Sequence, residues 1–173
     1  QEAGLVPIVE PEILMNGNHD IERCFEVSKA MLGFLFDELF AQRVRLEEIL
    51  LKPNMVISGN DCPKQAPLQQ VAEATLLCLR ETVPAAVPGI VFLSGGQSDE
   101  LATAHLNAMN QIVRAPWELS FSYGRALQAP VLQTWRGRSE NIRAAQEALF
   151  HRAQLNGAAR FGKYSEAMES KIN

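Results

Sequence analysis

The stretch Ile49-Leu50-Leu51-Lys52-Pro53-Asn54 decides the fold, because an apolar run changes there to polar residues within one position. A short apolar run bounded by turn residues is typical of a buried strand. The same change occurs at three other places in the chain, and a helical pattern follows each time. The four predicted strands cover residues 5–9, 49–51, 89–93 and 117–121.

The helical pattern after each strand consists of apolar residues that recur at the 3.6-residue period. Asp20 is the predicted N-cap of the first helix, and the residues from Gly157 onward are predicted to lie on the surface. Strands separated by helices predict parallel pairing with right-handed crossovers, which makes the fold class α/β. The predicted helices cover residues 20–42, 68–82, 98–111, 125–135 and 139–155.

Two architectures fit this order: an open doubly wound sheet, and part of a TIM (β/α)8 barrel. The chain has 173 residues, of which 47% are hydrophobic and 21% charged, so we expect one globular domain over residues 1–173. A complete barrel typically needs ~250 residues. Four βα units followed by closing helices would be half of one.

Charge and hydropathy exclude several classes of partner. The formal net charge of −4 leaves no basic surplus for nonspecific binding of nucleic acid or an anionic membrane. No apolar stretch approaches the ~20 residues that span a bilayer. The cysteines Cys24, Cys62 and Cys78 are isolated from one another, which predicts free thiols in a cytoplasmic protein.

Lys52 is the most informative single residue. It alone among the five lysines directly follows an apolar strand. A lysine held in an apolar barrel mouth tends to lose its proton, and a neutral amine can attack a carbonyl to form a Schiff base. A strand-end lysine can equally extend its ammonium group to solvent, and spacing alone favours that interpretation.

Glu10 and Glu12 follow the first predicted strand and flank Pro11. In an extended segment the two carboxylates would point to the same side. Two carboxylates in one pocket repel each other, which suits one of them for proton transfer. A solvated acidic loop is the alternative, and spacing alone favours it.

We call the residues that directly follow each strand the tip of that βα unit. The tips of the third and fourth units carry features of an anion site. Glycines allow backbone N–H groups to approach an anion, the start of a helix carries partial positive charge, and arginine offers a fork for phosphate oxygens. In barrels, a phosphate site is often built by the loops after strands 7 and 8. The candidate residues are Ser94, Gly95, Gly96, Ser122, Gly124 and Arg125.

Four blocks of the sequence together resemble the class I (Schiff-base) fructose-bisphosphate aldolase family. They follow the family's order at nearly its spacing, and the resemblance covers essentially the whole chain. The blocks are Gly4-Leu5-Val6-Pro7-Ile8-Val9-Glu10-Pro11-Glu12-Ile13-Leu14, Leu50-Leu51-Lys52-Pro53-Asn54-Met55-Val56, Phe92-Leu93-Ser94-Gly95-Gly96-Gln97-Ser98 and Phe121-Ser122-Tyr123-Gly124-Arg125-Ala126-Leu127-Gln128.

The resemblance implies a (β/α)8 barrel of which this chain supplies strands 5 to 8. Lys52 matches the Schiff-base lysine, Glu10 the carboxylate that exchanges protons around imine formation, and Glu12 a nearby active-site carboxylate. The loop of the substrate 1-phosphate and its completing residues match Ser94, Gly95, Gly96, Ser122, Gly124 and Arg125.

The implied reaction is reversible cleavage of fructose 1,6-bisphosphate, a step of glycolysis and gluconeogenesis. The imine on Lys52 serves as the electron sink, so we expect neither a metal ion nor a cofactor. The three histidines also lack a metal-ligand spacing.

A chain of 173 residues cannot close an eight-stranded barrel, so we expect a fragment of a longer chain or a half barrel with a partner half. The family's other half carries further active-site residues, and the family is often tetrameric. A partner is therefore expected to be a complementing N-terminal half or further copies. The alternative function is a noncatalytic half barrel that binds sugar phosphate or assembles with a partner.

Overall fold

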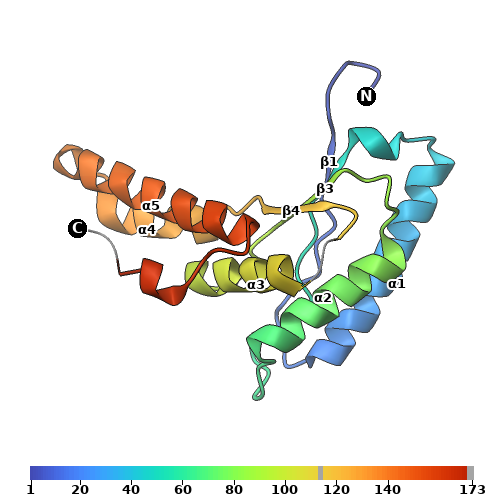
Figure 1. Cartoon of the computed structure of the whole chain (residues 1–173), viewed down its shortest axis with the longest axis horizontal. Coiled ribbons are helices and arrows are strands. Elements are labelled where there is room, and N and C mark those ends of the chain that lie inside the picture. The colour runs from blue at the N-terminus through green and yellow to red at the C-terminus, as the bar shows by residue number, and fades with distance from the viewer. Residues whose placement is uncertain (113–114, 171–173) are drawn as a thin grey trace.

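A computed structural model describes residues 1–112 and 115–170 of the chain. Strands and helices alternate along it (Figure 1). The strands are β1 (Ile8–Val9), β2 (Leu50–Leu51), β3 (Gly89–Phe92) and β4 (Glu118–Phe121). The α-helices are α1 (Ile21–Ala41), α2 (Leu68–Thr82), α3 (Asp99–Ile112), α4 (Arg125–Trp135) and α5 (Ile142–Arg160). Short 3-10 helices lie at Leu46–Glu48, Ser139–Asn141 and Glu166–Met168.

The four strands form one parallel sheet in the order β1-β2-β3-β4. Sequential order means that each crossover helix returns the chain to the next position along the sheet, as in a barrel. An open doubly wound sheet would reverse its order at a switch point. The helices follow one another around the strands in the same order, from α1 and α2 on one side to α4 and α5 on the other (Figure 1).

The two faces of the sheet differ in burial. Leu51, Ile90 and Leu119 are paired in register and are buried in the core that the helices cover. Leu50 and Val91 point to the opposite face and are only partly buried. Parallel sheets normally have both faces covered. We call the partly exposed side the inner face, because it would line the centre of a closed barrel.

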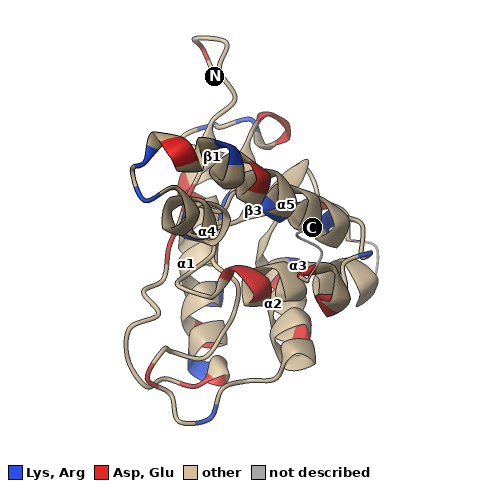
Figure 2. Ribbon diagram, turned by 90° about the vertical axis from the view of Figure 1, so that its left-hand side faces the viewer, with Lys and Arg blue, Asp and Glu red and all other residues tan. Residues whose placement is uncertain are grey.

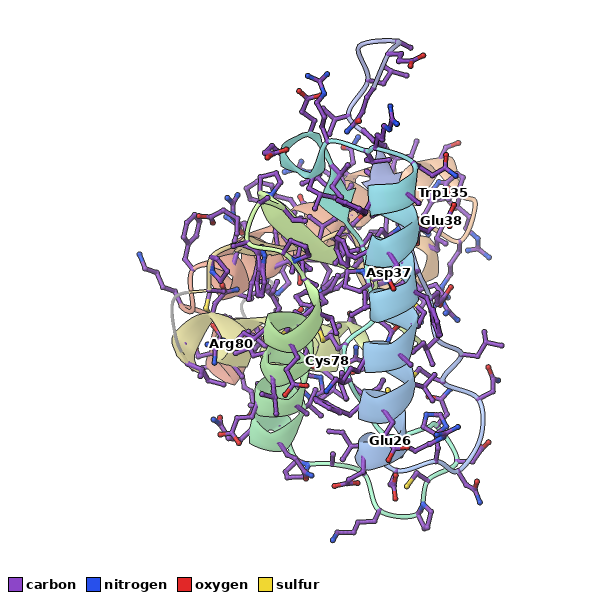
Figure 3. All side chains as sticks on the ribbon, turned by 90° about the vertical axis from the view of Figure 1, so that its right-hand side faces the viewer. Glu26, Asp37, Glu38, Cys78, Arg80 and Trp135 are labelled. Carbon is purple, nitrogen blue, oxygen red and sulfur yellow. The ribbon has the colours of Figure 1, made fainter. Side chains whose placement is uncertain are left out.

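Helix α1 begins where the sequence predicts. Asp20 is its N-cap, and its side chain accepts a hydrogen bond from the N–H of Arg23 at 2.8 Å. Helix α1 packs against α2, and Cys78 lies on the side of α2 that faces α1, whereas Arg80 lies on the other side (Figure 3). Burial raises the pKa of Cys78 to about 12, so this thiol is a core residue.

The surface agrees with the composition. Acidic and basic residues are interspersed along the helices (Figure 2), and their formal sum is −4. None of the helices that the structure describes is long and apolar enough to cross a membrane.

The predicted surface position of the residues from Gly157 onward holds for most of those that the structure describes and is wrong for Ala159 and Tyr164. Helix α5 continues to Arg160, and Ala159 and Tyr164 are buried. The buried face of α5 mixes polar residues with alanine and leucine: Arg152 Nη2 donates to Thr103 Oγ1 of α3 at 2.6 Å, and that hydroxyl donates to Asn156 Oδ1 at 2.8 Å. Polar residues at buried positions interrupt the apolar period in the sequence. Residues 171–173 of the predicted tail lie outside the described residues.

The loops that follow β1 and β2 are held together by their backbones. The N–H groups of Gly59, Asn60 and Asp61 donate to carbonyl oxygens of the first loop at 2.8–2.9 Å. The approach is so close that a Cβ atom added to Gly59 would lie 2.4 Å from the carbonyl oxygen of Gly17. Gly59 is therefore required by contact, because no other residue lacks the Cβ.

We predict that Gly59→Ala lowers the free energy of unfolding by about 1–3 kcal/mol, since the backbone atoms that it meets cannot move aside cheaply. Gly33→Ala is the matched control, because Gly33 lies inside α1 and a Cβ there meets no atom within 4 Å. The control should raise the free energy of unfolding by up to ~1 kcal/mol through helix propensity. Urea unfolding of the two variants measures both effects; equal effects would contradict the contact argument.

Candidate active site

Lys52 and Glu10 meet on the inner face of the sheet. Each lies two residues beyond an inner-face residue, Leu50 in one case and Ile8 in the other, and side chains alternate along a strand. Lys52 Nζ lies 2.8 Å from Glu10 Oε1. The lysine side chain is 20% exposed and the glutamate 47%, so the pair is sheltered on the lysine side and open on the other.

Backbone pairing continues past the strands and brings their tips together. The N–H of Lys52 donates to the carbonyl of Val9 at 2.7 Å, that of Leu93 to Pro53 at 3.1 Å, and that of Ser122 to Phe92 at 2.9 Å. Each of these bonds joins one unit to the next beyond the ends of the assigned strands. The four predicted tips therefore lie side by side along the carboxyl edge of the sheet.

The buried side chain of Asn54 links the first two tips by hydrogen bonds. Its Oδ1 accepts from the N–H of Ile13 at 3.0 Å, and its Nδ2 donates to the carbonyl of Met55 at 3.1 Å. The segment that carries Glu12 is thus tied to the segment that carries Lys52. Glu12 itself is exposed, and the structure records no hydrogen bond or ion pair of its side chain with a described residue.

The third tip is a tight turn from Ser94 to Gln97. The N–H of Gln97 donates to the carbonyl of Ser94 at 3.1 Å, and the two central residues, Gly95 and Gly96, have φ angles of +59° and +79°. Turns with positive φ at both central positions are dominated by glycine. The Gly-Gly pair is therefore required by the backbone, and it exposes peptide groups that carry no side chain.

The fourth tip leads from Ser122 into α4. Gly124 is the N-cap of α4, and Arg125 is the first helical residue and is exposed. Gly124 has a φ of −86°, which any residue adopts, and a Cβ there would meet no atom within 4 Å. Neither a positive φ nor a close contact accounts for this glycine. Gly124 thus leaves open space at the start of α4, where the helix dipole favours an anion.

Tyr123 lies between Ser122 and Gly124 but belongs to the core. Its hydroxyl donates to the carbonyl of Ala102 in α3 at 2.8 Å, and burial raises its pKa. The residue anchors the fourth tip to α3. It therefore positions its neighbours without facing them.

Sequence reasoning missed the contact between Gln97 and His105. Gln97 Oε1 lies 2.6 Å from His105 Nδ1, and Gln97 Nε2 donates to the carbonyl of Ser94 at 2.9 Å. His105 is 3% exposed, and its burial lowers its pKa to about 4. The sequence gives only a weak indication of this contact, namely a glutamine directly after Gly-Gly and a histidine on the following helix.

Within residues 1–112 and 115–170, no group of three or more His, Cys, Asp or Glu residues is arranged to hold a metal ion. The chemistry that the described residues offer is that of an amine beside a carboxylate, next to two glycine-containing tips.

Comparison with known proteins identifies the family. The family model described as fructose-bisphosphate aldolase class-I matches residues 1–173. The chain belongs to the class I fructose-bisphosphate aldolase family. The prediction of family membership is thereby confirmed.

Relatives of this aldolase chain come from bacteria and animals. It is 54% identical over 165 residues to a probable fructose-bisphosphate aldolase class 1 of Xanthomonas axonopodis pv. citri, covering 95% of this chain and 49% of that protein. It is 56% identical over 165 residues to fructose-bisphosphate aldolase B of Gallus gallus, covering 95% of this chain and 45% of that protein. The chain spans about half the length of the curated relatives it matches.

A solved aldolase structure confirms the fold class. The fructose-bisphosphate aldolase of Plasmodium falciparum, determined in complex with TRAP and a small-molecule inhibitor, superposes with a TM-score of 0.91 at 52% identity. The match covers 93% of this chain and 46% of that one. The four βα units therefore form part of a TIM barrel.

The burial of His105 predicts a pH dependence of stability. The folded protein protonates this ring only near pH 4, whereas an unfolded histidine is protonated below about 6.5, so stability falls as the pH drops from about 6.5 towards 4. Between pH 7 and pH 5 the unmodified protein should lose about 2 kcal/mol more than His105→Asn, which cannot titrate. Urea unfolding at the two pH values measures the difference; parallel losses would show that His105 is not the cause.

Proposed function

We propose that this chain supplies the Schiff-base half of a class I fructose-bisphosphate aldolase, in which Lys52 forms the imine with a ketose phosphate. The single observation that carries the proposal is the contact of Lys52 Nζ with Glu10 Oε1 at 2.8 Å, on the inner face at the carboxyl edge of the sheet. Barrel enzymes build their active sites at that edge.

The contact supports a division of roles between the two side chains. The ammonium form of lysine is not nucleophilic, and Glu10 lies within hydrogen-bond distance to accept its proton. The amine of Lys52 then attacks C2 of the open-chain sugar. Proton transfer through Glu10 assists the loss of water that leaves the iminium ion.

The iminium ion accepts the electron pair of the C3–C4 bond when that bond breaks, while a base of the completed pocket takes the proton of the C4 hydroxyl group, whose oxygen becomes the aldehyde oxygen. The products are glyceraldehyde 3-phosphate and an enamine of dihydroxyacetone phosphate on Lys52. Protonation of the enamine and attack by water on the resulting iminium ion release dihydroxyacetone phosphate and the free amine. Glu12, exposed at the same edge, is proposed as the further active-site carboxylate.

The third and fourth tips are proposed to hold the 1-phosphate of the substrate. Two positive-φ glycines and an open N-terminus of α4 with an arginine beside it form an anion site of backbone N–H groups and one cation. The residues of this proposed site are Ser94, Gly95, Gly96, Ser122, Gly124 and Arg125.

The proposed active site also requires that the barrel be closed around it. The inner face is open along β1 and β2, where Ile8 is 53% exposed, and the chain spans about half the length of its relatives. We propose that four preceding βα units cover this face, either in the same longer chain or as a complementing half. Further copies, as in a homo-oligomer, and a cytoplasmic location with reduced cysteines belong to the same proposal.

A noncatalytic half barrel is the second candidate. The observation that favours it is the same open inner face, because a chain of this extent provides one side only of the pocket around Lys52. Such a protein would bind a sugar phosphate at the third and fourth tips, or associate through its open edge, without forming an imine.

Borohydride trapping tests the role of Lys52. We define the completed protein as this chain preceded by the first four βα units of the Xanthomonas axonopodis relative. With dihydroxyacetone phosphate and borohydride, the completed protein should acquire a reduced adduct on Lys52, and Lys52→Arg should lose kcat by ~10³-fold or more. Mass spectrometry of peptides locates the adduct.

Lys29→Arg is the matched control, because Lys29 pairs with Glu81 on the surface of α1 and α2. It should leave both the adduct and kcat unchanged. Cleavage of fructose 1,6-bisphosphate by Lys52→Arg at the unmodified rate would contradict the Schiff-base proposal. An adduct in the completed protein and none in the chain alone would show that the pocket needs both halves; none in either would favour the noncatalytic half barrel.

Two glycine substitutions distinguish a glycine that leaves room for the ligand from a glycine that the backbone conformation requires. Gly124→Ala should lower the free energy of unfolding by no more than ~1 kcal/mol, because no atom lies within 4 Å of the added Cβ and the remaining cost is that of a poorer N-cap. Its methyl group should nevertheless raise KM for fructose 1,6-bisphosphate about tenfold, by occupying phosphate space. Gly96→Ala should cost about 1–2 kcal/mol of stability, because φ is +79° there. Steady-state kinetics and urea unfolding of the completed protein measure the two effects; an unchanged KM for Gly124→Ala would argue against the phosphate site.

A further inference from the structure

The carbonyl oxygen of Ser94 is held by two donors from one residue. The backbone N–H of Gln97 donates to it at 3.1 Å and closes the turn, and the side-chain Nε2 of Gln97 donates to the same oxygen at 2.9 Å. A turn needs only the first of these bonds. The second fixes the direction of the carbonyl group.

The direction of this carbonyl decides where the N–H of Gly95 points. Both groups belong to one peptide unit, and the described residues contain no cis peptide bond. In a planar trans peptide the C=O and the N–H point in opposite directions. Because Gln97 holds the Ser94 carbonyl on its own side, the Gly95 N–H is directed away from Gln97.

The Gly95 N–H is available for a ligand. Across residues 1–112 and 115–170, the structure records no acceptor for it. Neither Gly95 nor Gly96 places a side chain of its own on this peptide edge. An N–H group in this position suits a phosphate oxygen.

His105 determines which end of the Gln97 amide faces Ser94. A backbone carbonyl only accepts, so the nitrogen of the amide must face Ser94 and the oxygen must face His105. The ring must then donate from Nδ1, at the recorded 2.6 Å, which defines the tautomer. Nε2 is buried without a partner among the described residues, and burial keeps the ring neutral.

The contact is sheltered from competing partners. His105 is 3% exposed and Ser94 is 6% exposed, and Gln97 Nε2 also lies 3.6 Å from Met55 Sδ. Gln97 and His105 form one wall of a pocket behind the turn, together with Asn60 and Gln65. A hydrogen-bonded chain of this kind has one satisfied arrangement, because reversing the amide places two acceptors against each other at Ser94 and two donors against each other at His105.

We propose that Gln97 and His105 are positioning residues that aim the Gly95 N–H at the 1-phosphate of the substrate. The inference rests on the proposed aldolase function, because it names how that phosphate site is oriented. Neither side chain touches the substrate. His105 acts through Gln97, and Gln97 acts through the Ser94–Gly95 peptide.

The test compares two ketones in the completed protein. Dihydroxyacetone phosphate carries the phosphate that Gly95 would bind, and unphosphorylated dihydroxyacetone does not. Half-saturating concentrations for borohydride adduct formation on Lys52 are measured for both. His105→Asp places an acceptor where Nδ1–H stood, whereas the near-isosteric His105→Asn keeps a donor at that position.

We expect His105→Asp to raise the half-saturating concentration of dihydroxyacetone phosphate about tenfold, which corresponds to about 1.4 kcal/mol. The value for dihydroxyacetone should stay within twofold, and His105→Asn should restore the affinity for the phosphorylated ketone. Gln97→Met removes the bond to Ser94 without adding a charge, and it should reproduce the selective loss even where His105→Asp does not fold. Gln69→Met is the control, because Gln69 is exposed on α2 and donates to Glu73 of the same helix; it should change neither value.

Three results would overturn the inference. An equal loss for both ketones in Gln97→Met would show a general loosening of the site. A loss in His105→Asn equal to that in His105→Asp would show that the donor at Nδ1 is irrelevant. Absence of an adduct with either ketone in the unmodified completed protein would reject the proposed function itself, and the positioning role with it, before any variant is compared.

Discussion

In-register parallel pairing that continues beyond the strands is the constraint on which the rest of the structure depends. The bonds from Lys52 to Val9, from Leu93 to Pro53 and from Ser122 to Phe92 extend the ladder into residues that no longer count as strand. Through them, residues separated by 30 to 43 positions become neighbours. The contact of Lys52 with Glu10 follows directly, because both side chains leave paired backbones on the same face.

The polar tips are supported by polar contacts behind them. Asn54 ties the first two tips together, and Tyr123 anchors the fourth to α3. Helix α3 is in turn joined to α5 through Arg152, which donates to Thr103 and forms an ion pair with Glu169 at 2.6 Å. Buried polar groups that hydrogen-bond to one another favour one arrangement over its alternatives, which is the property that a positioned loop requires.

Much of the fold could be predicted from the sequence, because its strands and helices differ in period. The bounds of α2 and α4 agree with the prediction to the residue. The strands are shorter than predicted, since pairing with neighbours rather than apolar character limits them. The end of α5 and the Gln97–His105 contact could not be predicted, because polar side chains that meet in the core leave no periodic signal.

The separation of the two sheet edges has a consequence for how the chain can be cut. All four tips lie at the carboxyl edge, whereas the connections that enter β2 and β3, residues 42–49 and 83–88, lie at the other edge. New termini in those connections, as in circular permutants, would leave every tip and its ladder bond in place. Assembly of the pocket therefore does not depend on the order in which the units follow one another along the chain. Breaks of the chain at the amino edge should be tolerated, whereas breaks between Pro53 and Gln65 should not.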